Sequence, residues 1–156
     1  MAEIILRDED GRRVFAVKHA VESGPRPSDY LREAARIRLV FRHTPGSVCG
    51  KPQKVGEFYY GQPEGAVDYY ECPVEPSPAN VAALLATGFA WAADAAELAA
   101  RYPVDPALVA RIRADVDAAH QNNVRKMREC RERLDKGDRS EAVMQALREA
   151  LEGLAG

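Results

Sequence analysis

The stretch EPSPAN, residues 75–80, separates two parts of this sequence that follow different patterns. Ser77 is a favourable helix N-cap, and Pro78 suits the first helical position, where its missing N–H would have no partner anyway. Hairpin patterns occur before this point, in residues 1–75, and helical periodicity follows it, in residues 76–156. We therefore predict one α+β domain over residues 1–156, with a β-rich first part and a helical second part.

The β-rich part contains two hairpin patterns. In EIILRDEDGRRVFAVKHAV (residues 3–21), two β-rich runs flank Asp10-Gly11, a dipeptide that tolerates the positive φ of a tight turn. In EFYYGQPEGAVDYYECPV (residues 57–74), the turn falls at residues 63–65. Between the hairpins, Ser28 is placed to cap a short helix over residues 29–35. RIRLVFRH (residues 36–43) then alternates apolar residues with arginines, which predicts a half-buried strand and brings the antiparallel sheet to about five strands.

The helical part is expected to contain three helices. The first runs from Pro78 to about Arg101, because Pro103 stops it. Asp105-Pro106 repeats the start signal, and since no breaker follows before Gly137, we predict a helix of about thirty residues and ~45 Å. The last helix begins with a capping box, Asp138 to Glu141.

The long helix carries an apolar seam in steps of three and four, a coiled-coil rhythm in which Asn123 would set the register. A helix of this length exceeds the core of a small domain, so we predict that it pairs with a second copy in a homodimer. The alternative is that the same seam packs on another helix of its own chain. The predicted seam consists of Val109, Ile112, Val116, Asn123, Met127 and Leu134.

Charge is unevenly distributed along the chain. Residues 1–54 carry a net charge of +4 and residues 101–156 of +1, whereas residues 55–100 contain no Lys or Arg and carry −7. Such a one-signed segment can steer a partner of opposite charge. Alternatively, the basic first block neutralises it across neighbouring strands. The acidic segment also holds two Tyr-Tyr pairs, one in each arm of the second hairpin, and the predicted partner-binding patch consists of Glu57, Tyr59, Glu64, Asp68, Tyr70 and Glu71.

These patterns favour a non-catalytic binding protein that recognises a basic protein surface, as an inhibitor or adaptor of a nucleic-acid-processing machine would. The start of the chain lacks a secretory signal, and the three scattered cysteines are typical of free thiols, so we expect a cytoplasmic protein. The apolar stretch 81–93 is too short to cross a membrane.

Nucleic-acid binding is the first alternative. A row of basic side chains on the predicted strand 36–43 and in the loop after it is able to neutralise phosphates. The pI near 6.0 is lower than that of most dedicated nucleic-acid binders. The residues of this alternative are Arg36, Arg38, Arg42, Lys51 and Lys54.

The second alternative is a thiol-dependent enzyme at HTPGSVCG (residues 43–50), with Cys49 as nucleophile and His43 as base. His19, His43, Cys49 and Cys72 together offer four zinc ligands, but no C-x-x-C or H-x-x-x-H spacing supports such a site. The chain has no phosphate-binding loop motif either. We therefore predict no metal, no cofactor and no catalytic residues.

Overall fold

A computed structural model of the protein describes residues 2–22, 28–59 and 66–155. The elements in chain order are β1 (Glu3–Glu9), β2 (Arg12–Glu22), α1 (Ser28–His43), β3 (Gln53–Tyr59), β4 (Ala66–Val74), α2 (Pro78–Thr87), β5 (Ala90–Trp91), α3 (Ala93–Ala99), α4 (Pro106–Asp135) and α5 (Glu141–Ala155).

The strands form one sheet in the order β3-β4-β2-β1-β5. The pairs β1/β2, β2/β4 and β3/β4 are antiparallel, whereas β5 pairs with β1 in parallel over two residues. The first turn has φ of 50° at Asp10 and 78° at Gly11, as a tight hairpin turn requires. The α+β class and both hairpins are thus confirmed, while the predicted turn at residues 63–65 lies outside the described residues.

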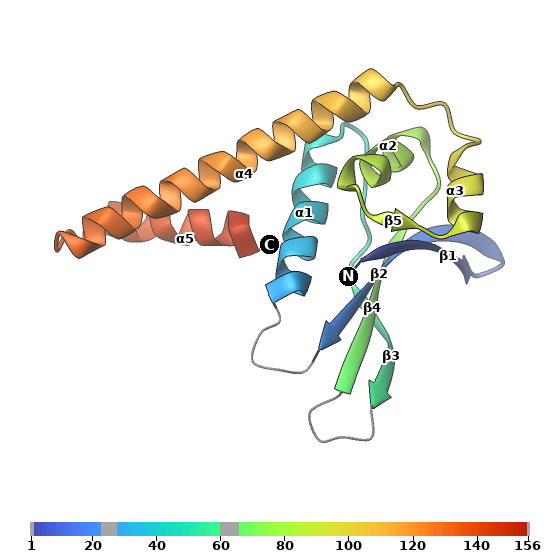
Figure 1. The fold of residues 1–156 in the computed structure, drawn as a ribbon, viewed down its shortest axis with the longest axis horizontal. Helices are drawn as coiled ribbons and strands as arrows, with labels where there is room; N and C mark the ends of the chain where they lie inside the picture. The colour runs from blue at the N-terminus through green and yellow to red at the C-terminus, as the bar shows by residue number, and fades with distance from the viewer. Residues whose placement is uncertain (1, 23–27, 60–65, 156) are drawn as a thin grey trace.

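Helices α1 and α2 lie between the sheet and the long helix α4, and α5 folds back beside α4 so that the C-terminal end approaches α1 (Figure 1). The buried apolar cluster draws residues from the sheet, from α1 to α3 and from the first half of α4. Within the described ranges, no helix combines the length and the apolarity needed to span a membrane.

The predicted strand at residues 36–43 is wrong, because these residues form the second half of helix α1. The alternation arises from two buried faces. Ile37 lines a pocket together with sheet residues, whereas Leu39 lies near Val116 of α4. Since residues two apart lie on nearly opposite sides of a helix, a helix packed on both sides shows the period of a strand.

The predicted single helix from Pro78 to Arg101 is also wrong, since it is divided into α2, β5 and α3. Ser77 caps α2 as expected, accepting a hydrogen bond from the backbone N–H of Asn80 at 3.0 Å. Gly88, with φ of 73°, then ends the helix in the left-handed conformation. The chain thereby turns back and adds β5 to the edge of the sheet beside β1.

Helix α4 begins at Pro106, after an Asp105 cap, and its 30 residues confirm the predicted length. Its first half is buried in the main core, and its second half pairs with α5 in an antiparallel hairpin. Asn123 contacts this hairpin partner, because a Cβ placed on Gly153 would lie 2.5 Å from the Asn123 Nδ2 atom. The alternative of pairing within one chain therefore describes this structure.

The predicted capping box of the last helix needs correction. The Ser140 hydroxyl caps α5 by accepting from the backbone N–H of Val143 at 3.4 Å. Asp138 lies two residues earlier and accepts from the backbone N–H of Ser140 at 3.1 Å. Both Asp138 and Ser140 have short polar side chains that are able to cap a helix. The turn before α5 places Ser140 at the N-cap position.

Candidate functional site

Two strands bring His19 and Cys72 together on the face of the sheet that α1 covers. Val17 of β2 lies opposite Cys72 of β4, so His19 and Cys72 are diagonal neighbours on one face. Both are buried, at 1% and 5% exposure, and a hydrogen bond joins their side chains. The sheet register thus places an imidazole against a thiol.

Glu33 of α1 completes a chain of hydrogen bonds through this histidine. Its Oε2 lies 3.0 Å from His19 Nδ1, and its Oε1 accepts from the backbone N–H of Ala2 at 2.7 Å. The same imidazole also interacts with the Cys72 side chain. The order carboxylate, imidazole, thiol is that of a nucleophile whose base is oriented by a third group.

The loop after α1 supplies a second thiol to this cluster. Cys49 hydrogen bonds with Cys72, and the next residue, Gly50, donates its backbone N–H to Pro73 O at 2.8 Å. A Cβ on Gly50 would lie 2.6 Å from Pro73 Cγ and 2.8 Å from Pro73 O. Only glycine therefore lets this loop approach β4 so closely.

Further hydrogen bonds hold the Cys49 loop in place. Asn80 of α2 accepts from the backbone N–H of Val48 at 2.8 Å. Ser47 donates its hydroxyl to the carbonyl groups of Phe41 and Thr44, both at 2.8 Å. The segment HTPGSVCG is thus an anchored turn that presents Cys49 to the sheet.

The three neighbouring groups shift one another's protonation. The hydrogen bond from Cys49, joined by the interactions with His19, lowers the pKa of the Cys72 thiol although burial opposes the shift. Burial by itself lowers the pKa of His19, but hydrogen bonds with Cys72 and Glu33 outweigh it and raise the pKa above 6.5. The hydrogen bond to Cys72 raises the pKa of Cys49, and burial adds to this. The favoured state is a Cys72 thiolate beside an imidazolium, with Cys49 as a thiol donor.

A pocket of about 250 Å³ opens onto this cluster. Its walls include His19, Cys49 and Cys72. We call these three residues and Glu33 the thiol site. Ile37 contributes an apolar wall, and two exposed cations, Arg38 and Lys51, also line the pocket. The site can therefore admit a small polar molecule to a thiolate next to a proton donor.

The sequence-based alternative paired Cys49 with His43, and the structure places only Cys49 at the pocket. Cys49 belongs to the thiol site, but its thiol partner is Cys72 and the imidazole of the cluster is that of His19. His43 does not line the pocket. Among the described residues, no group of three or more His, Cys, Asp or Glu side chains is arranged to hold a metal ion.

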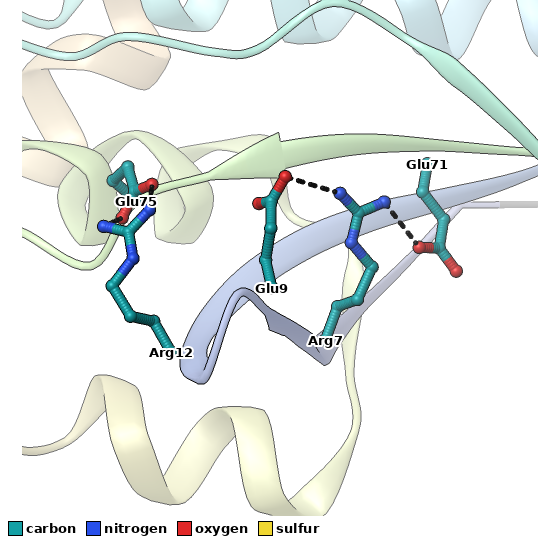
Figure 2. A network of polar contacts seen from close by, with 5 residues as sticks. All are labelled: Arg7, Glu9, Arg12, Glu71 and Glu75. Atoms are coloured by element: carbon teal, nitrogen blue, oxygen red, sulfur yellow. Dashed lines mark hydrogen bonds and ion pairs between the residues drawn. The ribbon is translucent and has the colours of Figure 1, made fainter.

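Two carboxylates of the acidic segment are paired with arginines of the first hairpin, as Figure 2 shows. Glu71 Oε2 lies 3.2 Å from Arg7 Nη1, and Glu75 Oε1 lies 3.1 Å from Arg12 Nη2. Glu71 is buried, at 8% exposure, so it is not available to a partner in this structure. For these two residues the charge is compensated within the chain.

The structure does not describe Glu64 of the predicted partner patch. It also does not describe the side chains of the remaining patch residues on β3 and β4, which are Glu57, Tyr59, Asp68 and Tyr70. The patch as a whole stays a prediction, for Glu57, Tyr59, Glu64, Asp68 and Tyr70.

The predicted arginine row does not form one face, because residues 36–43 are helical. Arg36 turns toward α2 and donates from Nε to Thr87 O at 2.7 Å. Arg38 and Arg42, one turn apart, line a groove of about 570 Å³ together with Arg148 of α5. Lys51 lies at the thiol pocket, and the side chain of Lys54 is outside the described part of the chain. Nucleic-acid binding stays a prediction, although the structure does not place its five basic residues in one row.

The predicted dimer seam is largely occupied within the chain. Val109, Ile112 and Val116 are buried in the main core, whereas Met127 and Leu134 are half-buried along the α4–α5 hairpin. The homodimer stays a prediction, which size exclusion coupled to light scattering tests directly.

Comparison of the chain with models of protein families, with curated proteins and with solved structures finds no match.

Sequence reasoning placed Cys49, Cys72 and His19 in one hypothetical zinc set but missed Glu33 and the thiol pairing. One signal was present, since period two puts His19 on the same strand face as Phe15 and Val17. A histidine on an apolar strand face requires a buried polar partner. Only the structure shows that Glu33 is this partner.

Proposed function

We propose that this protein performs thiol chemistry, with Cys72 as the nucleophile that reacts with small electrophiles entering the thiol pocket. The observation that carries this proposal is the hydrogen-bonded chain from Glu33 through His19 to Cys72 at the wall of a pocket. Thiolates rather than thiols are nucleophilic, and a neighbouring imidazolium stabilises the thiolate.

Each group of the thiol site has a distinct role in this proposal. Cys72 provides the attacking sulfur, and His19 holds the proton that the thiol has released. Glu33 is a positioning residue, because it fixes the imidazole through Nδ1 and favours its protonated form. Cys49 donates a hydrogen bond that favours the Cys72 thiolate before reaction.

The proposal is tested by alkylation of the full-length protein with iodoacetamide under native conditions. A Cys130→Ala background restricts labelling to the two thiols of the site, and peptide mass spectrometry locates the label. An ordinary thiol with a pKa of about 8.5 is only ~0.3% thiolate at roughly pH 6. We expect Cys72 to be labelled readily at that pH, because its lowered pKa keeps the thiolate populated below the ordinary value.

The matched variant is His19→Gln, which removes the imidazolium. In this variant the pH at which labelling declines should move upward, toward the ordinary thiol value. Thiolate ultraviolet absorbance gives the same titration without depending on reagent access, and circular dichroism checks the fold. Titration of Cys72 at an ordinary thiol pKa in the unaltered protein, or labelling of Cys49 in place of Cys72 at roughly pH 6, would refute the proposal.

The sequence-based hypothesis of a non-catalytic binding protein is separate from this proposal. An affinity pull-down from the native host, with and without nuclease treatment, addresses it, since a basic protein partner would persist after nuclease whereas a nucleic-acid bridge would not.

A further inference from the structure

We propose that Cys72 and Cys49 act as a peroxide-reducing pair, in which Cys72 is oxidised first and Cys49 then closes a reversible disulfide with it. This inference rests on the proposed function of Cys72 as the nucleophile. It adds the substrate class, hydroperoxides, and assigns Cys49 the role of resolving thiol.

The first support is the contact between the two thiols. Cys49 and Cys72 are distant in sequence, yet their side chains hydrogen bond with each other and line the same pocket. The Gly50 N–H to Pro73 O hydrogen bond of 2.8 Å clamps their backbones side by side. A disulfide between them therefore requires no large movement of either segment.

The second support is the size of the opening. Cys72 is only 5% exposed, and the pocket in front of it has a volume of about 250 Å³. A hydroperoxide of small molecular size fits this space, whereas the disulfide of a folded protein cannot reach the sulfur. The pocket thus favours a small oxidant over a protein substrate.

The third support is the charge around the pocket. Peroxide cleavage releases an alkoxide or hydroxide, which requires a proton and gains from nearby positive charge. His19 is in contact with Cys72 and supplies the proton, while Arg38 and Lys51 line the same pocket as cations.

The proposed cycle consumes one hydroperoxide and one dithiol and returns both cysteines to their starting state. The Cys72 thiolate attacks the peroxide, so that an S–O bond forms, the O–O bond breaks, and the sulfur is oxidised by two electrons to a sulfenic acid. The released alkoxide takes the proton of the His19 imidazolium and leaves as an alcohol. The Cys49 thiol then attacks the Cys72 sulfur, an S–S bond forms, the S–O bond breaks, and the Cys49 proton joins the departing hydroxide as water. A dithiol reductant restores both thiols by exchange and is itself oxidised to a disulfide.

The test treats the fully reduced Cys130→Ala protein with one equivalent of hydrogen peroxide. We expect a loss of two hydrogens from the intact mass, a Cys49–Cys72 linked peptide on non-reducing digestion, and full reversal by dithiothreitol. A lower pKa raises the thiolate population near neutral pH but lowers its nucleophilicity by a similar factor. The expected rate, on the order of tenfold above that of free cysteine, therefore comes from the His19 proton and the pocket cations, which stabilise the leaving oxygen.

The diagnostic variant is Cys49→Ser in the same background. It retains the oxidisable Cys72 but removes the resolving thiol, so Cys72 should accumulate as a sulfenic acid that dimedone traps. Cys72→Ser should give neither the disulfide nor the fast reaction.

The outcomes separate this inference from the proposed function. Fast alkylation of Cys72 combined with a peroxide rate no higher than that of free cysteine would overturn the inference and leave the proposed function standing. The same holds if oxidation yields sulfenic or sulfinic acid on Cys72 without the Cys49 link. If Cys72 is slow toward both iodoacetamide and peroxide, both proposals fail.

Discussion

Cys72 and Cys130 are equally buried, at 5% exposure each, but they lie in regions of different construction. Cys72 sits on the sheet beneath α1, where strands, a helix and a loop converge on one point and bring polar groups into contact with its sulfur. Cys130 lies on α4, in the half of that helix that packs on α5. Equal burial therefore does not make two cysteines chemically equivalent, because the neighbours decide the state of the thiol.

The two regions also differ in how they are stabilised. The sheet with α1, α2 and the first half of α4 forms one buried cluster, while the second half of α4 lies outside it and packs on α5, which also contacts α1. Among the described residues, every buried side-chain nitrogen or oxygen has a hydrogen-bond partner. The sheet region can thus hold a buried histidine and carboxylate without an unpaired polar atom.

The largest effect is expected from removing core volume on α4. Ile112→Ala should lower the free energy of unfolding by about 2–5 kcal/mol, because Ile112 is 1% exposed and its loss leaves a cavity. Leu134→Ala, at the half-buried end of the same helix, should cost clearly less. Urea denaturation of both variants measures the difference, and equal losses would show that the hairpin end is as tightly packed as the core.

The next effect concerns the ion pairs of the sheet. Glu71→Ala should destabilise the protein by about 1–3 kcal/mol, because it leaves the partly buried guanidinium of Arg7 with Glu9 as its remaining carboxylate partner. Glu75→Ala removes the exposed pair with Arg12 and should cost at most about 1 kcal/mol. Denaturation curves at low and high salt check both values, since only the Glu75 effect should disappear at high salt.

Comparison of two Gly→Ala variants distinguishes damage to the thiol site from backbone strain alone. Gly50→Ala should cost about 1–3 kcal/mol and also raise the pKa of Cys72, because the new Cβ collides with Pro73 and displaces Cys49. Gly88→Ala meets no atom within 4 Å and should cost about 1 kcal/mol for its left-handed φ alone. Thermal melts and thiolate absorbance together separate the two, and an unchanged Cys72 titration in Gly50→Ala would contradict the role given to this glycine.

The smallest effect is expected at the helix caps. Ser77→Ala and Asp105→Ala each remove one side-chain acceptor at a helix start and should each cost about 1 kcal/mol. Chemical denaturation measures both. A much larger loss for Ser77 would indicate that the start of α2 also secures Asn80, which anchors the Cys49 loop.

Local signals were sufficient for much of the fold. The hairpin at Asp10-Gly11, the caps at Ser77 and Asp105, and the length of α4 depend on neighbours a few residues away, and each was predicted correctly. The thiol site was predicted less well, because His43 lies closer to Cys49 in sequence than His19 does. Sequence proximity selected the wrong imidazole, since the register of β2 and β4 and the crossing of α1 decide which one reaches the thiols.

The amino-acid sequence by itself determined the α+β class, the turn and cap positions and the long helix, because these follow from backbone preferences of adjacent residues. Only the tertiary structure decided that residues 36–43 are helical, that Gly88 ends α2, and that Glu33, His19, Cys72 and Cys49 meet. The physical reason is burial on two sides: helix α1 lies between the sheet and α4, and the packing energy of both faces outweighs the local pattern that favoured a strand.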